Sequence, residues 1–324
     1  MNIPLFEKLH QEGLISAPSL EKIKADPSNT LFSVHWEIKT FLYLGVLLLT
    51  GGLGILVYKN IDSIDNQAIV AFIILVTAGS FFYCVNKKLP FSTDKVAPPN
   101  SFFDYIVLLA CLTFIILIAY IQYQYKIFGN RYGLATFFPM LVLFFSAYYF
   151  DHLGVLSLAI TNLGAWLGLT ITPLQLLQSN DFNSMTIIVT GLLLGAFLIA
   201  IEELSNRKNI KKHFALTYAN FGMHILFISS LAAIFQSSHR YLLWFLLLIT
   251  IAYYFYSKGI KQRSFYFITV ATLYTYIGLC YVIVELLILI NSDVAINFGS
   301  LYFIGSTAAL VLFLRDANKK IKIG

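Results

Sequence analysis

The chain has 324 residues, of which 58% are apolar, 16% aromatic and only 12% charged, and its formal net charge is +6. Soluble domains carry about 25% charged residues, so this composition, with a mean hydropathy of +0.77, excludes disordered, fibrous and ordinary soluble globular proteins. It predicts an all-α fold class, a polytopic bundle of membrane-spanning helices.

Residues 1–36 form a polar segment ahead of the apolar part of the chain. Leu5, Phe6 and Leu9 repeat at helical spacing before Gly13, and a second short helix follows Ser16. Charged residues throughout the segment leave no apolar core for a cleavable signal peptide, so we expect insertion to start from the first membrane helix. We expect a cytoplasmic pair of helices that caps or anchors the membrane domain, with docking of a partner protein as the alternative.

Two neighbouring stretches carry a family resemblance. LHQEGLISAPSLEKI is followed by LGVLLLTGGLGILVYKNID, a Gly-rich first span that ends near an Asn. Over about Leu9 to Ile74 the chain resembles the bacterial predicted-membrane-protein family called domain of unknown function 2157. The resemblance implies a protein of the bacterial inner membrane, and it implies no activity.

Apolar runs define the spans. A bilayer core about 30 Å thick needs about twenty apolar residues in a helix. Ten such runs predict ten transmembrane helices within residues 37–316, before a short basic cytoplasmic tail at 317–324. Asp151 and His152 divide an apolar stretch that is too long for one span. The runs are Lys39–Tyr58, Gln67–Val85, Phe103–Tyr123, Gly133–Phe150, Leu153–Ile171, Met185–Ile201, His213–Phe235, Tyr241–Tyr256, Ser264–Ile290 and Phe298–Leu314.

Basic residues indicate the orientation of these helices. With the N-terminus inside, 18 of the 22 Lys and Arg residues fall in inner segments, and only Lys59, Lys126, Arg131 and Arg240 in outer ones. Because Lys and Arg concentrate in short cytoplasmic loops, this split predicts that both termini are cytoplasmic and that the number of spans is even. We attribute the positive net charge to topology and expect no nucleic-acid partner; the expected partner is the lipid bilayer.

Motifs for catalysis and metal binding are missing from the sequence. Cys84, Cys111 and Cys280 lie in apolar runs without a CxxC pair, which argues against a disulfide framework or a zinc site. There is no HExxH, GxSG or P-loop motif, and a membrane haem would need two histidines at similar depth where only His224 lies deep. We expect no catalytic residue, no metal and no cofactor.

Polar side chains at membrane depth are the candidate functional residues, because an unpaired ionisable group is costly there. His224 lies near the middle of the seventh span, with Thr217 and Asn220 on the same helix face. The two interpretations are an interhelical hydrogen-bond stripe and the polar wall of a water-filled cavity. Both predict that His224 points into the bundle.

Glu285 is the second ionisable group, five residues before the outer end of the ninth span, with Tyr274 and Tyr281 on its face. Either a tyrosine hydroxyl satisfies the Glu285 carboxylate, or this carboxylate binds a proton or a cation. Asn162 in the fifth span is a further polar candidate. The candidate cavity-lining residues are therefore Thr217, Asn220, His224, Tyr274, Tyr281, Glu285 and Asn162.

Three functions remain open on the sequence. The preferred one is an uncharacterised inner-membrane protein with an envelope or scaffold role. A transporter of the ten-helix drug/metabolite type is the alternative, because Lys39–Ile171 and Met185–Leu314 are halves of similar length, each with a Gly-rich first helix. A membrane enzyme is the third. A continuous wet cavity between the halves favours transport, and a packed bundle favours the scaffold. Substrate and oligomeric state are not specified by the sequence.

Overall fold

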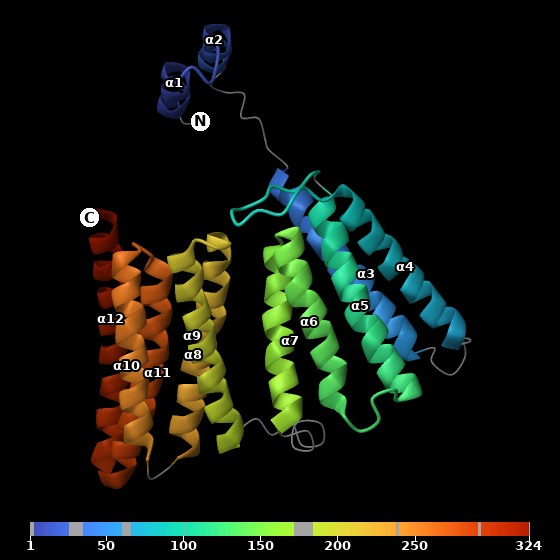
Figure 1. Cartoon of the computed structure of the whole chain (residues 1–324). Helices are drawn as coiled ribbons and strands as arrows, with labels where there is room; N and C mark the ends of the chain where they lie inside the picture. Colours follow the sequence, from blue (N-terminus) through green and yellow to red (C-terminus); the bar gives the residue numbers. More distant parts are fainter. Residues whose placement is uncertain are drawn as a thin grey trace. The chain divides into compact units, whose positions relative to one another are not determined.

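The structure, a computed structural model, describes residues 3–25, 35–59, 66–100, 102–171, 184–237, 240–290 and 293–323. All regular structure in these ranges is helical, which confirms the predicted all-α fold class (Figure 1). The predicted outer connections at 60–65, 172–183 and 291–292 lie outside the described residues. The helices are α1 (Ile3–Gln11), α2 (Ala17–Ala25), α3 (His35–Lys59), α4 (Asn66–Lys87), α5 (Phe103–Tyr125), α6 (Tyr132–Phe150), α7 (Leu153–Ile171), α8 (Met185–Lys208), η2 (Lys212–Phe214), α9 (Ala215–Gln236), α10 (Tyr241–Lys261), α11 (Phe265–Ile290) and α12 (Asp293–Ile323).

The predicted spans correspond one by one to helices α3 to α12. Among the described residues, nine helices are long and apolar enough to cross a membrane, and a shorter apolar stretch, Thr40–Ile55, lies within α3. Helices α8 and α12 continue past the predicted ends of their spans. Exposed pairs at i,i+4 spacing, Glu203 with Arg207 and Asp316 with Lys320, each at 2.8 Å, support these extra turns. The chain is therefore a polytopic helical membrane protein.

The chain divides into two compact units, residues 1–52 and 53–324. In the first unit, α1 and α2 pack on each other. Gly13 follows α1 with φ of +70°, a left-handed conformation that glycine adopts without steric cost. The Leu14 N–H donates to the Leu9 carbonyl at 2.9 Å, which ends the helix as the sequence predicts at this glycine.

In the second unit the helices pack mainly as chain-neighbour pairs, α4 with α5, α6 with α7, α8 with α9 and α10 with α11. The tightest described approach is between α8 and α9. A Cβ added to Gly195 would lie 3.1 Å from the Gly222 carbonyl oxygen, and one added to Gly222 would lie 3.0 Å from that of Gly195. Small residues of this kind allow two membrane helices to bring their backbones together.

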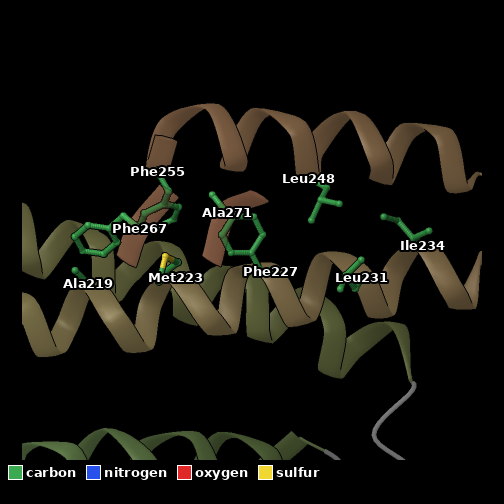
Figure 2. Packing of buried hydrophobic residues seen from close by; sticks show 9 residues of the cluster. All are labelled: Ala219, Met223, Phe227, Leu231, Ile234, Leu248, Phe255, Phe267 and Ala271. Atoms are coloured by element: carbon green, nitrogen blue, oxygen red, sulfur yellow. The ribbon is translucent and has the colours of Figure 1, made fainter. Parts of the chain in front are cut away.

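Helix α9 forms the centre of the second half of the bundle. Its span is 50% buried, more than any other candidate span among the described residues, and its apolar residues pack against α10 and α11 (Figure 2). The cluster consists of Ala219, Met223, Phe227, Leu231, Ile234, Leu248, Phe255, Phe267 and Ala271. A polar side chain on the buried face of α9 therefore lies against a neighbouring helix or bonds its own, as Ser230 does to the Leu226 carbonyl at 2.7 Å.

Candidate functional site

His224 on α9 contacts two tyrosines of α11. Its Nδ1 lies 3.0 Å from the Tyr274 hydroxyl and its Nε2 lies 2.9 Å from the Tyr266 hydroxyl. A neutral imidazole has one donor and one acceptor nitrogen, so one tyrosine donates to the ring and the other accepts from it. The Tyr274 ring is stacked on Phe227 at 4.9 Å. Both nitrogens of His224 on α9 are thus engaged by hydroxyls of α11.

The other candidate residues lie in separate places. The Oδ1 atom of Asn220, one turn before His224, is buried and has no hydrogen-bond partner, and Thr217 is half-buried. Tyr281 forms a side-chain hydrogen bond with Glu285, nearer the C-terminal end of α11. The structure therefore joins His224 to Tyr274, and Tyr281 to Glu285, as two separate pairs along α11.

Asn162 lies in a third place. It lines an open hollow of about 630 Å³ among α5, α6 and α7, together with Gln122, Lys126 and Thr136. Gln122 is itself engaged with the connection after α5, because its amide donates to the Gly129 carbonyl at 2.9 Å. This hollow belongs to the first half of the chain.

The Asp151 side chain, in the two-residue connection between α6 and α7, has three polar partners. Asp151 ends α6 in a left-handed conformation, φ 58°, and its side chain is only 3% exposed. One carboxylate oxygen lies 2.5 Å from His213 Nε2. The other lies 3.1 Å from Lys211 Nζ and accepts the Val96 N–H at 2.5 Å. Three connections therefore meet at one carboxylate.

Lys211, between α8 and η2, is as deeply buried as its partner. Its side chain is 1% exposed, and its ammonium also donates to the Asp94 carbonyl at 3.2 Å. The backbone N–H donates to the Thr93 carbonyl at 2.7 Å, and the ammonium lies 5.1 Å from the centre of the Phe91 ring. A buried ion pair is tolerated when further hydrogen bonds satisfy both ions, as they do here. We call Asp151, Lys211 and His213 the inner ion cluster.

His152 follows Asp151 and caps the next helix. Its Nδ1 accepts the Val155 N–H at 3.1 Å, so Nε2 carries the proton and donates to the Asp104 carbonyl at 2.9 Å. Burial lowers the pKa of His152 below its ordinary value of 6.5, outweighing the opposing effect of the nearby Asp104 carboxylate. The neutral ring thus ties the start of α7 to the start of α5.

A second buried ion pair joins α8 to α10. The Lys258 ammonium bonds Glu202, whose side chain is 3% exposed, and the Asn206 amide donates to the other oxygen of the carboxylate at 2.6 Å. The rings of Tyr254 and Phe267 lie 5.7 Å and 5.8 Å from the same ammonium. Glu202 lies one residue beyond the predicted sixth span, at a position where no sequence pattern predicts burial.

The two buried ion pairs link segments of the chain, and the space beside Asp151 and Lys211 leaves little room for a reaction. The hollow beside Asp151 and Lys211 has a volume of about 10 Å³, enough for one water molecule at most. Among the described residues, no group of three or more His, Cys, Asp or Glu side chains could hold a metal ion. The carboxylates of both ion pairs are already occupied by cations and N–H donors.

The sequence analysis missed the inner ion cluster because Asp151 and His152 were interpreted only as the break between two spans, and His213 only as the start of a span. The available signal was that Asp151 and His152 are the only charged or ionisable interruption between two apolar helices. Their partners lie 48 to 62 positions away in the sequence, so no local pattern identifies them.

Comparison with known proteins gives one match. Residues 7–156 match the family described as predicted membrane protein (DUF2157), which confirms the resemblance predicted from Leu9 to Ile74 and extends it. The matched segment includes Asp151 and His152 but ends before Lys211 and His213. Searches among curated proteins and among solved structures gave no significant match.

Proposed function

We propose that this multi-pass membrane protein is a scaffold of the bacterial inner membrane whose two halves, residues 39–171 and 185–314, are fixed to each other. The observation that carries the proposal is the inner ion cluster. Asp151 belongs to the first half, while Lys211 and His213 belong to the second. A scaffold needs a constant shape, and this cluster holds the halves in one arrangement.

The cost of breaking the cluster is the main argument against a transporter. Transporters built from two repeats alternate their access by rocking one half against the other. Such a motion would separate Asp151 from Lys211 and leave a buried charge without its partner, which costs about 3–5 kcal/mol. The hydrogen bonds that Lys211 donates to the Thr93 and Asp94 carbonyls of the first half would also be lost.

The deep polar groups and the described hollows support the same proposal. His224 is occupied by two tyrosine hydroxyls, and Glu285 by Tyr281. The hollow that Asn162 lines is formed by α5, α6 and α7, and another hollow is formed by α10, α11 and α12. Each of these two hollows lies within one half, whereas a transport path of the two-repeat type runs between the halves.

The distribution of basic residues predicts which side of the membrane the inner ion cluster faces. The connections that meet at Asp151 are inner ones in the predicted topology, so the cluster faces the cytoplasm in this proposal. Helices α1 and α2 precede the first span on the same predicted side. We propose that this helical pair, with Leu14 68% exposed between the two helices, provides the docking surface for a cytoplasmic partner protein.

Cysteine accessibility tests the scaffold against the transporter. In a background without the native cysteines, Ala159→Cys in α7 and Ala219→Cys in α9 place thiols at positions that are 0% and 2% exposed, in helices through which the halves touch. Both should resist a membrane-impermeant thiol reagent at any imposed pH gradient, while the exposed control Lys208→Cys reacts. Reaction at Ala159→Cys or Ala219→Cys would contradict the scaffold and favour transport.

A further inference from the structure

The hollow that Asn162 lines extends along three helices of the first half, α5, α6 and α7. Ile115, Ala119, Gln122 and Lys126 follow one another on α5 at spacings of three or four residues, so one face of α5 forms a wall of the hollow. Asn162 belongs to α7. The volume of about 630 Å³ lies within the range of about 300–1,000 Å³ typical of small-molecule sites.

The mouth of the hollow, at the connection between α5 and α6, has a fixed geometry. The buried Gln122 amide donates to the Gly129 carbonyl at 2.9 Å, and its carbonyl oxygen accepts the Phe128 N–H at 3.0 Å. Lys126 has a left-handed backbone conformation, φ 49°, and donates its N–H to the Gln122 backbone carbonyl at 3.0 Å. Gln122 therefore holds Lys126 beside the hollow, and no ligand is needed to place it.

Lys126 gives the mouth a positive charge. Its ammonium forms no ion pair with another described residue, and no Asp or Glu is among the described residues that line the hollow. Arg131, next to the lining residue Tyr132, is a second exposed cation at this end of the helices. Ammonium groups bind carboxylates and phosphates through charge-assisted hydrogen bonds. The mouth therefore favours an acidic group.

Asn162 offers a second polar contact deeper in the bundle. A Cβ added to Gly133, at the start of α6, would lie 2.7 Å from Thr170 Oγ1, so this part of α7 is level with the start of α6. Asn162 lies eight residues before Thr170, about 12 Å further into the bundle by helix rise. Its amide has no hydrogen-bond partner among the described residues, and an unsatisfied amide is costly in hydrocarbon. An occupant with a polar group at this depth would satisfy it.

We propose that this hollow binds a single-chain anionic amphiphile, with its acidic group at Lys126 and a hydroxyl or carbonyl of its chain hydrogen-bonded to Asn162. An amide both donates and accepts, so it can bind either group. Ile115, Ala119 and Leu169 give the chain an apolar lining. The volume is that of one small molecule, which favours a single chain over a two-chain lipid. The proposal goes beyond the scaffold role and does not depend on it.

Three probes that differ in one polar group test the two contacts by native mass spectrometry of the detergent-purified full chain. The first, 12-hydroxystearate, has a carboxylate at one end and a hydroxyl two-thirds of the way along its chain. Stearate lacks this hydroxyl, and 1,12-octadecanediol has a neutral hydroxyl in place of the carboxylate. Wild type should bind 12-hydroxystearate about threefold more tightly than stearate. It should bind 12-hydroxystearate about fivefold more tightly than the diol.

Each of two variants should lose one preference and keep the other. Lys126→Gln should bind 12-hydroxystearate and the diol equally and still distinguish 12-hydroxystearate from stearate. Asn162→Leu should bind 12-hydroxystearate and stearate equally and still distinguish 12-hydroxystearate from the diol. The matched controls, Arg131→Gln and Thr161→Val, change exposed neighbours that do not line the hollow, and both should behave as wild type. Because each variant keeps one preference, a misfolded protein cannot produce this result.

Four results would overturn the proposal. Wild type could lack either preference, or both variants could keep both preferences. Displacement of 12-hydroxystearate by an equal concentration of palmitoyl-oleoyl phosphatidylglycerol would show that the hollow recognises the anionic head of a two-chain lipid. A second copy bound to wild type and released by Asn162→Leu would show that Asn162 lies in a protein interface.

Discussion

The Asp151 carboxylate lies 3.1 Å from the Lys211 ammonium, and the two side chains are only 3% and 1% exposed. The pair joins the connection between α6 and α7 to the connection between α8 and α9. Each ion has a further donor or acceptor, the Val96 N–H for Asp151 and the Asp94 carbonyl for Lys211. Removing one member therefore leaves several buried polar atoms unsatisfied.

Asp151→Asn should destabilise the protein strongly, because it leaves the Lys211 charge buried without a counter-ion. We expect the free energy of unfolding in detergent micelles to fall by about 3–5 kcal/mol. The control is Glu203→Gln, which breaks the exposed pair with Arg207 and should cost at most about 1 kcal/mol. Equal losses in the two variants would show that the inner ion cluster contributes no more than a surface pair.

His152 predicts how stability depends on pH. Burial lowers the pKa of His152 from its ordinary 6.5, so on acidification the unfolded chain takes up a proton before the folded chain does. The contribution of His152 is therefore present above pH 6.5 and lost as the pH falls through the lowered folded pKa. His152→Gln should flatten this part of the curve of unfolding free energy against pH, and His10→Gln, in α1, should not. An unchanged slope in His152→Gln would contradict this interpretation.

The hydrogen bonds of His224 predict an energetic coupling between α9 and α11. His224→Ala removes the partner of two tyrosine hydroxyls and should lower the free energy of unfolding by about 1–3 kcal/mol. A double-mutant cycle with Tyr274→Phe should give an interaction energy of about 0.6 kcal/mol, as is usual for hydrogen bonds between membrane helices. Tyr253→Phe, at a side chain that is 74% exposed, is the control and should be neutral. Additive effects of His224→Ala and Tyr274→Phe would exclude the bond.

The distribution of basic residues predicts the topology. Reporters fused after Arg240 or Asn291 should read as outside, and those after Lys211 or Lys261 as inside. Paired alkaline phosphatase and green fluorescent protein fusions at each site give opposite signals and serve as mutual controls. A cytoplasmic signal at Asn291 would rule out ten helices with both termini inside.

The fold could be predicted largely from the sequence because span length and charge act locally. Ten apolar runs predicted the helices α3 to α12, and Asp151 with His152 marked the break between α6 and α7. Gly13 marked the end of the first helix, where the backbone has positive φ. Each of these signals depends on a few adjacent residues and on the thickness of the bilayer.

The polar contacts could not be predicted in the same way. His224 was identified as a deep polar residue, but its partners, Tyr266 and Tyr274, follow from the way that α9 packs against α11. Asp151 was identified only as a boundary, since the Lys211 that pairs with it lies beyond two further helices. A periodic pattern shows which face of a helix is polar, whereas the partner depends on which helices become neighbours.

If the inner ion cluster fixes the two halves to each other, the distance between them should have a single value, and that distance can be measured. Lys95, between α4 and α5, and Lys208, at the end of α8, are both exposed and lie in different halves. Spin labels at Lys95→Cys and Lys208→Cys report the distance between these two positions in liposomes by pulsed electron spin resonance. We expect one narrow distance distribution in the otherwise native chain and a broad one when Asp151→Asn is added. Two distance populations in the native chain, or an unchanged distribution with Asp151→Asn, would show that the inner ion cluster does not fix the halves.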